Sequence, residues 1–147
     1  MLGRLARWLR IAGFDVLYEP HIKDGELLRI AIKEERVVLT RDTRFVQRKA
    51  ASDRSFLIRS ETPIIQLKEV LSAFGLKPLK TGRCPSCNGV LVKVRKKEKY
   101  KDHIPEHVYL TRNHFFRCRG CGRLYWEGSQ YERQKKILDD IIKDNAS

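Results

Sequence analysis

Four cysteines in two pairs constrain this 147-residue chain more than any other feature of its sequence. The pairs are Cys84-Pro-Ser-Cys87 and Cys118-Arg-Gly-Cys121, with 30 residues between them and no cysteine left over. Each Cys-x-x-Cys turn brings two thiolates to one metal ion, and four thiolates complete the closed tetrahedral shell of a structural zinc site. The pattern therefore predicts a zinc ribbon whose metal has no position open for catalysis.

The same cysteines bear on the compartment and on competing ligands. Paired metal-ligand spacing is unlike the framework of a secreted disulfide-rich domain, so we expect a reducing, cytoplasmic location. A redox dithiol or free thiols are the alternative interpretation of the pairs. Gly89 and Gly122 follow the two pairs and are expected to let backbone N–H groups point at sulfur. With four thiolates present, His103, His107 and His114 are not needed as ligands.

The charge balance narrows the class of partner. The chain has 31 Lys and Arg against 18 Asp and Glu, a net charge of +13 and a pI of about 9.9. Such a surplus favours a polyanion, most often nucleic acid, with an anionic membrane surface as the second option. No apolar run approaches the roughly 20 residues of a membrane span. The Arg-rich first 13 residues allow a mitochondrial presequence as an alternative to a folded helix, and the folded helix is favoured.

Residues 1–79 alternate helical and strand-like segments. Apolar residues at helical spacing predict the helices, and short apolar runs predict strands that are buried on both faces. The expected helices are Leu2–Ala12, Asp24–Glu35, Arg44–Ala50 and Ile64–Phe74, and the expected strands are Val16–Tyr18, Val37–Thr40 and Phe56–Ile58. This alternation predicts an α/β domain with a parallel sheet.

The composition changes after residue 79. Residues 80–128 contain all four cysteines and carry 12 Lys and Arg against 4 Asp and Glu. Strands are expected at Val90–Val94 and within His107–Cys118, with Arg95–Lys101 as a basic hairpin tip between them. We therefore predict three parts: an α/β domain over residues 1–79, a zinc ribbon over 80–129 and a C-terminal helix over 130–147.

Basic and aromatic side chains are the candidate contacts to RNA. Lysine and arginine neutralise phosphates, and aromatic rings stack on bases. The basic candidates are the stripe on the first helix, the residue after the second strand and the ribbon tip: Arg4, Arg7, Arg10, Arg41, Lys96, Lys97 and Lys99. The alternative for the tip is a solvated lysine cluster. The aromatics near the metal are favoured as the small core of the ribbon over a stacking platform, and they are Phe115, Phe116, Tyr125 and Trp126.

Acidic residues gather at one edge of the predicted sheet. Chemistry in parallel sheets collects at the carboxyl ends of strands, and Val37–Thr40 runs directly into Asp42. Asp24 and Glu26 start a nearby helix. Carboxylates at such an edge can hold Mg²⁺ or Mn²⁺ for phosphodiester hydrolysis. The competing interpretation is structural, because Asp24 and Asp42 are also suited to capping helices, with Glu26 favoured in a first turn.

Five motifs occur in one order along the chain: MLGRLARWLRIAG, DGELLRIA, VVLTRD, RCPSCNG and RCRGCGRLYWEGS. Together they span roughly residues 1–133 and resemble the Mut-seven C-terminal RNase family, a PIN-like domain fused to a zinc ribbon. The resemblance implies a three-layer α/β/α PIN-like fold and a metal-dependent ribonuclease. It places Asp24 and Asp42 at two acidic positions, where they would be catalytic and bind Mg²⁺ or Mn²⁺. It places the ribbon's zinc on Cys84, Cys87, Cys118 and Cys121.

The resemblance also implies a departure from the family pattern. Members usually carry a strand ending in Asp just before the first helix, and this sequence starts after that point, so the N-terminal strand is missing from the expected sheet. Arg44 stands where many PIN domains place a further acid. Three explanations stay open: a longer natural chain, a partner strand from another chain that completes the sheet, or an inactive relative. The inactive relative would bind RNA or a ribonucleoprotein such as the ribosome without cutting RNA.

Overall fold

The computed structural model describes residues 2–146 and divides into two compact units, each made of two segments of the chain. Unit 1 contains Met1–Ala6 and Leu17–Leu76, and unit 2 contains Arg7–Val16 and Lys77–Ser147. The division falls within the first helix, α1 (Gly3–Ile11). The three-part division along the sequence did not anticipate that residues 7–16 belong with the ribbon.

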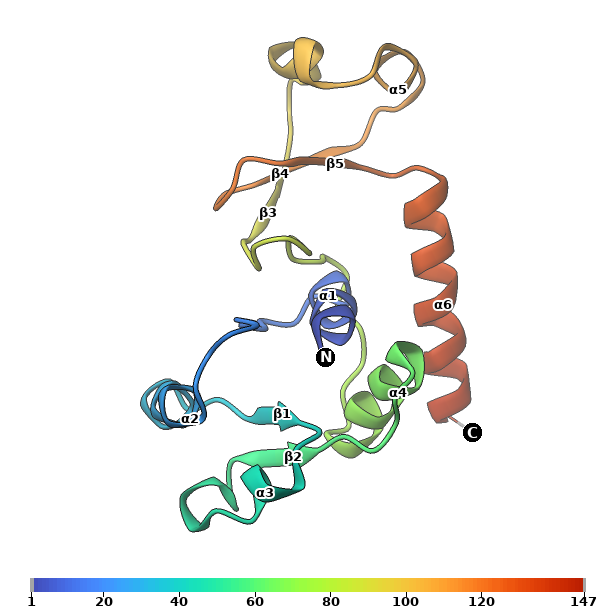
Figure 1. Cartoon of the computed structure of the whole chain (residues 1–147). Helices are drawn as coiled ribbons and strands as arrows, with labels where there is room; N and C mark the ends of the chain where they lie inside the picture. Colours follow the sequence, from blue (N-terminus) through green and yellow to red (C-terminus); the bar gives the residue numbers. More distant parts are fainter. Residues whose placement is uncertain (1, 147) are drawn as a thin grey trace. The chain divides into compact units, whose positions relative to one another are not determined.

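Unit 1 is built around two parallel strands, β1 (Val38–Thr40) and β2 (Ser55–Leu57). Leu39 pairs with Phe56 at the centre of this register. The strands lie side by side with α2 (Asp24–Lys33) next to β1 (Figure 1). The connection from β1 to β2 runs through two short helices, and a longer one follows β2: α3 (Thr43–Val46), η1 (Lys49–Ala51) and α4 (Pro63–Ala73). The predicted parallel pairing of the second and third strands is confirmed.

A small apolar cluster explains why these segments meet. Phe45 of α3 is buried with Ala31, Val38 and Ala51, and two partly buried leucines of α2 pack against the cluster. The cluster therefore holds α2, α3 and η1 against β1. Removing this apolar surface from water is the main favourable term for such an assembly.

The predicted strand at Val16–Tyr18 is wrong, because these residues form no strand. The backbone N–H of Val16 donates to the side chain of Asn88 at 2.9 Å rather than to a neighbouring strand. Leu17 is 51% exposed and Tyr18 is 39% exposed, so this short apolar run does not enter a core.

Unit 2 contains an antiparallel sheet in the order β3-β4-β5, formed by Leu91–Lys93, Phe115–Cys118 and Leu124–Trp126. The buried residues Ile104, Val108 and Phe115 form its core, with Trp126 packed against them. The aromatics Phe115 and Trp126 thus belong to the core of the ribbon, as the sequence favoured. The longest helix, α6 (Ser129–Ala146), follows β5.

The predicted basic hairpin tip is wrong. The chain between β3 and β4 instead forms a 3₁₀ helix, η2 (Lys97–His103), and an α-helix, α5 (Glu106–Thr111), seen above the sheet in Figure 1. The strand predicted within His107–Cys118 is therefore confined to β4. Ile104 and Val108 cause the difference, since both are buried against the sheet and draw the insertion back onto it.

Among the described residues, no helix combines the length and the apolar character that crossing a membrane requires.

The end of α2 gives a test of local backbone strain. Glu34 caps the helix at φ −101°, and Glu35 follows at φ 54°, a left-handed conformation that side chains other than glycine disfavour. We expect Glu35→Gly to raise the free energy of unfolding by about 0.5 to 1 kcal/mol. Glu34→Gly is the matched control and should lower it, because Glu34 has an ordinary φ. Urea unfolding followed by circular dichroism measures both, and equal effects at the two positions would contradict this account.

A candidate zinc centre and the predicted acidic site

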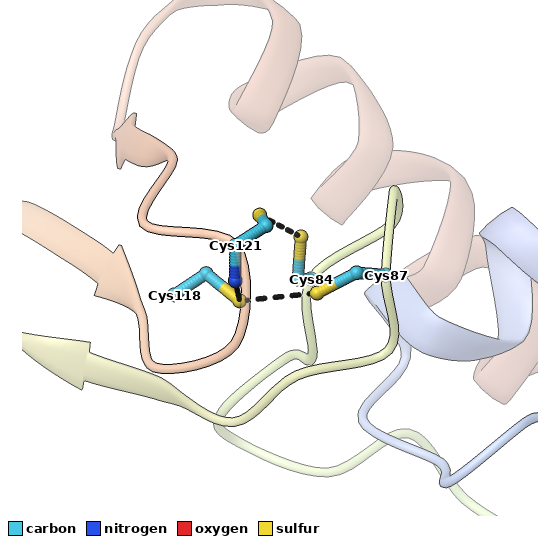
Figure 2. A group of neighbouring side chains, drawn as sticks. All are labelled: Cys84, Cys87, Cys118 and Cys121. Carbon is cyan, nitrogen blue, oxygen red and sulfur yellow. Dashed lines mark hydrogen bonds between the residues drawn. The ribbon is translucent and has the colours of Figure 1, made fainter.

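The four cysteine sulfur atoms point toward one another from two loops (Figure 2). All four lie within 4.8 Å of one another. The distance is 3.7 Å from Cys84 Sγ to Cys121 Sγ and 3.3 Å from Cys87 Sγ to Cys118 Sγ. A tetrahedral zinc site with Zn–S bonds of about 2.3 Å has sulfurs roughly 3.8 Å apart, whereas a disulfide needs about 2.05 Å. The four cysteines can therefore hold one structural Zn²⁺, as the sequence predicted.

Backbone N–H groups reach the sulfur atoms in both turns. In the first turn the N–H of Gly89 donates to Cys87 Sγ at 3.3 Å, as predicted. In the second turn the N–H of Gly120 donates to Cys118 Sγ at 3.3 Å. Gly122, which was expected to allow the tight backbone of this turn, has φ 79° and donates its own N–H to the carbonyl oxygen of Cys118. These donors stabilise thiolates, the form that binds a metal.

Tyr125, which the sequence analysis weighed as a ribbon core residue or a stacking ring, contacts a cysteine of the centre. Its hydroxyl lies 2.9 Å from Cys84 Sγ. Burial, followed by this hydrogen bond, holds the pKa of Tyr125 well above its ordinary value. In β5 Tyr125 alternates with the core residue Trp126, and this alternation is the signal that places its ring on the zinc side of the sheet.

The electrostatics of the second turn favour metal binding. Burial opposes ionisation of Cys118, but the backbone N–H of Cys121 and other donors outweigh it and lower the pKa of Cys118 to about 6. Cys84 and Cys118 are buried, whereas Cys87 and Cys121 are exposed. The centre thus has one buried edge within the ribbon and one edge open to solvent.

Histidines take no part in this centre. His103, His107 and His114 are exposed, and the four cysteines are the one group of three or more potential metal ligands among the described residues. The prediction that these histidines are not ligands is consistent with that arrangement.

Asp42 caps the helix that follows it. Its Oδ1 accepts a hydrogen bond from the backbone N–H of Arg44 at 2.9 Å, which makes it the N-cap of α3. Its own N–H donates to Thr40 Oγ1 at 3.0 Å. Asp42 therefore has the capping role that the sequence analysis gave as the alternative to metal binding. Its side chain is also exposed to solvent.

Asp24 is the first residue of α2 and not its N-cap, a position that Lys23 takes without a side-chain hydrogen bond. The Asp24 carboxylate lies 3.4 Å from the guanidinium of Arg48 and is half exposed. Glu26 pairs with Arg29 within the same helix, and this hydrogen bond lowers the pKa of Glu26. Among the residues whose side chains are described, no three carboxylates come together as a metal site.

The predicted RNA contacts differ in exposure and fall into three groups. Arg4, Arg7, Lys96 and Lys99 are exposed, as a phosphate contact requires. Arg41 is a quarter exposed beside Glu61. By contrast, Arg10 and Lys97 hold internal positions.

Arg10 and Lys97 each donate to backbone carbonyl oxygens. Arg10 is only 7% exposed and bonds to Val16 and Pro85. Lys97 Nζ donates to the carbonyl oxygens of Tyr109 at 2.5 Å and Arg112 at 3.1 Å, at the end of α5. These two side chains therefore support the fold of unit 2.

Two glycines provide a test of the zinc centre. A Cβ atom at Gly89 would lie 2.4 Å from Cys118 Sγ, whereas one at Gly25 in α2 would meet nothing within 4 Å. We expect Gly89→Ala to lose zinc to a chelator far more readily than the unaltered protein. The matched control Gly25→Ala should retain zinc and gain slightly in helix stability, because alanine favours helices over glycine. Zinc content by mass spectrometry measures both, and full zinc retention by Gly89→Ala would contradict the centre's geometry.

Comparison with known families identifies the family of the chain. The model of the Mut7-C RNAse domain matches residues 1–138, which include both acidic positions and all four cysteines. No curated protein and no solved structure matches the chain. Because the match covers most of the sequence and agrees with the motifs, the chain belongs to the Mut7-C RNAse domain family.

Proposed function

We propose that this protein is a ribonuclease that needs Mg²⁺ or Mn²⁺, with a structural zinc ribbon that helps to bind RNA. Membership of the Mut7-C RNAse domain family carries the proposal. The parallel pairing of β1 with β2, together with Asp42 just after β1, supports a PIN-like three-layer arrangement for unit 1. The four thiolates suit a reducing, cytoplasmic compartment.

Asp24 and Asp42 would hold the divalent cation. Both carboxylates lie in unit 1 and both are exposed. The cation would supply an activated water and neutralise charge on the phosphate. Asp24 would exchange its ion pair with Arg48 for the cation, a small loss because exposed pairs contribute little. Asp42 would keep its Oδ1 on the N–H of Arg44, which fixes the orientation of the carboxylate.

The exposed basic residues would bind the RNA backbone. Arg4 and Arg7 belong to α1, and Lys96 and Lys99 lie at the start of the insertion between β3 and β4. Contacts of this kind bind phosphates whatever the base sequence and weaken as salt rises. Arg41, next to Asp42, would place a phosphate near the cation.

A second candidate function is binding without cleavage. The observation that favours it is the structural role of Asp42, which caps α3. Two carboxylates also hold Mg²⁺ weakly, because the ion usually needs more oxygen ligands than they offer. In this case the protein would bind RNA or a ribonucleoprotein such as the ribosome, and its basic surface would be its main functional feature.

Substitutions at Asp42 separate the two functions. Asparagine caps helices about as well as aspartate, so Asp42→Asn removes the charge and keeps the cap. We expect Mn²⁺-dependent cleavage of end-labelled single-stranded RNA that Asp42→Asn abolishes at unchanged stability. Asp42→Ala is the control for the cap and should also lose about 1 kcal/mol of stability. Cleavage that survives in Asp42→Asn would reduce Asp42 to a capping residue, and no cleavage by the unaltered protein would favour binding alone.

Lysines of the insertion test the RNA surface. The double substitution Lys96→Gln and Lys99→Gln should weaken RNA binding and make its salt dependence shallower by about 0.7 in the log–log slope for each phosphate that is no longer neutralised. Lys97→Gln is the matched control, because Lys97 is bound to the end of α5. It should reduce thermal stability more than RNA affinity. Unchanged affinity and slope in the double variant would remove the insertion from the RNA site.

A further inference from the structure

Arg10 is buried, unlike the other two arginines of α1. Arg4 and Arg7, earlier in α1, are exposed, whereas Arg10 is 7% exposed. Its Nε donates to the carbonyl oxygen of Val16 and its Nη1 to that of Pro85, each at 2.9 Å. Pro85 lies inside the first Cys-x-x-Cys turn. The buried guanidinium therefore joins the end of α1 to the loop that supplies two zinc ligands.

A buried guanidinium needs negative charge nearby, because burial in low dielectric disfavours an isolated ion. Burial lowers the pKa of Arg10, and the negative charges of Cys84 and Cys87 counter this. Four thiolates around Zn²⁺ carry a net charge of about −2. The thiolates of the first turn, together with Asp15, are therefore negative groups that favour the charged form of Arg10, and the guanidinium is bonded to Pro85 between those two thiolates in the sequence.

Asn88 makes a second connection from the same turn. It follows Cys87 directly and is buried, with φ at 71°. Its Oδ1 accepts from the backbone N–H of Val16 at 2.9 Å, and its Nδ2 donates to Asp15 Oδ1 at 2.6 Å. Both sides of the first turn, at Pro85 and at Asn88, therefore hold the segment that leaves α1.

The backbones approach closely along this connection. The N–H of Arg83 donates to the carbonyl oxygen of Arg10, and the N–H of Leu79 donates to that of Ala12, each at 2.7 Å. A Cβ atom at Gly82 would lie 2.8 Å from the carbonyl oxygen of Ile11. The connection thus depends on main-chain fit as well as on the Arg10 side chain, and all its residues lie in unit 2.

We propose that Arg10 is a positioning residue of the zinc centre, which compensates the thiolate charge and couples zinc binding to the order of residues 10–16 at the end of α1. The inference rests on zinc binding by the four cysteines and does not depend on nuclease activity. In the alternative, Arg10 is one more phosphate-binding residue of the basic stripe. Its burial and its two carbonyl partners favour the zinc role.

Two measurements on the full zinc-loaded chain test the proposal. The first is zinc affinity by competition with a chromophoric chelator. Arg10→Gln should lower it by about 10- to 100-fold, the range for residues that support metal ligands. Arg10→Lys keeps the positive charge, so its zinc affinity should lie between those of Arg10→Gln and the unaltered protein. Arg7→Gln, on the exposed side of the same helix, is the matched control and should bind zinc like the unaltered protein.

The second measurement is amide hydrogen exchange with and without zinc. Removal of zinc from the unaltered protein should raise exchange at residues 13–16, and Arg10→Gln should raise it even with zinc bound. Asn88→Gly tolerates the left-handed φ and leaves no buried charge, so it provides a second variant if Arg10→Gln fails to fold. It should raise exchange at Val16.

The outcomes either support the proposal or overturn it. Zinc affinity in Arg10→Gln equal to that of Arg7→Gln would overturn it, as would protection of residues 13–16 that does not respond to zinc removal. A reduced RNA affinity in Arg10→Gln at full zinc affinity would assign Arg10 to the RNA surface instead. Failure of the nuclease assay alone would leave these measurements unaffected, because none of them uses cleavage as its readout.

Discussion

The convergence of four thiolates on one point is the interaction on which unit 2 depends. Its strands are only three or four residues long, and the apolar cluster at its sheet has three buried members, so apolar burial at the sheet gives little stability. The ligand Cys118 is also a residue of β4, where it pairs with Leu91 of β3. A metal bound there joins the sheet to both turns. Small domains of this kind commonly obtain their folding free energy from the metal.

The acidic and basic side chains show how one residue type takes different roles according to burial. Arg7 and Arg10 lie one turn apart in α1, yet Arg7 is exposed while Arg10 bonds to two carbonyl oxygens. The same contrast separates Lys97 from Lys99. Asp42 is both bonded and exposed: one oxygen of its carboxylate caps α3, and the side chain still faces solvent. A family-level activity therefore has to be tested on variants that keep the structural role of each residue.

Much of the local structure could be predicted from the sequence. The candidate zinc ligands follow from spacing alone, and the helices α1 and α4 follow from apolar residues at helical spacing. The predicted strand at Val16–Tyr18 and the basic hairpin tip failed for a shared reason. Each was inferred from a short run of residues, whereas tertiary contacts decided the outcome: Asn88 binds Val16, and Ile104 and Val108 are drawn onto the ribbon sheet.

The sequence by itself determined the candidate zinc ligands, the parallel sheet of unit 1 and the family. These depend on spacing and on local periodicity, which the order of residues expresses directly. Only the tertiary structure decided that residues 7–16 cluster with residues 77–147, that Arg10 bonds to the first cysteine turn and that the Tyr125 hydroxyl lies beside Cys84. These contacts join residues far apart in the chain. They could not be predicted from the sequence for a physical reason. The residues next to a charged side chain in the sequence do not show whether that side chain faces solvent or a buried partner, because the partner is set only when the chain has folded.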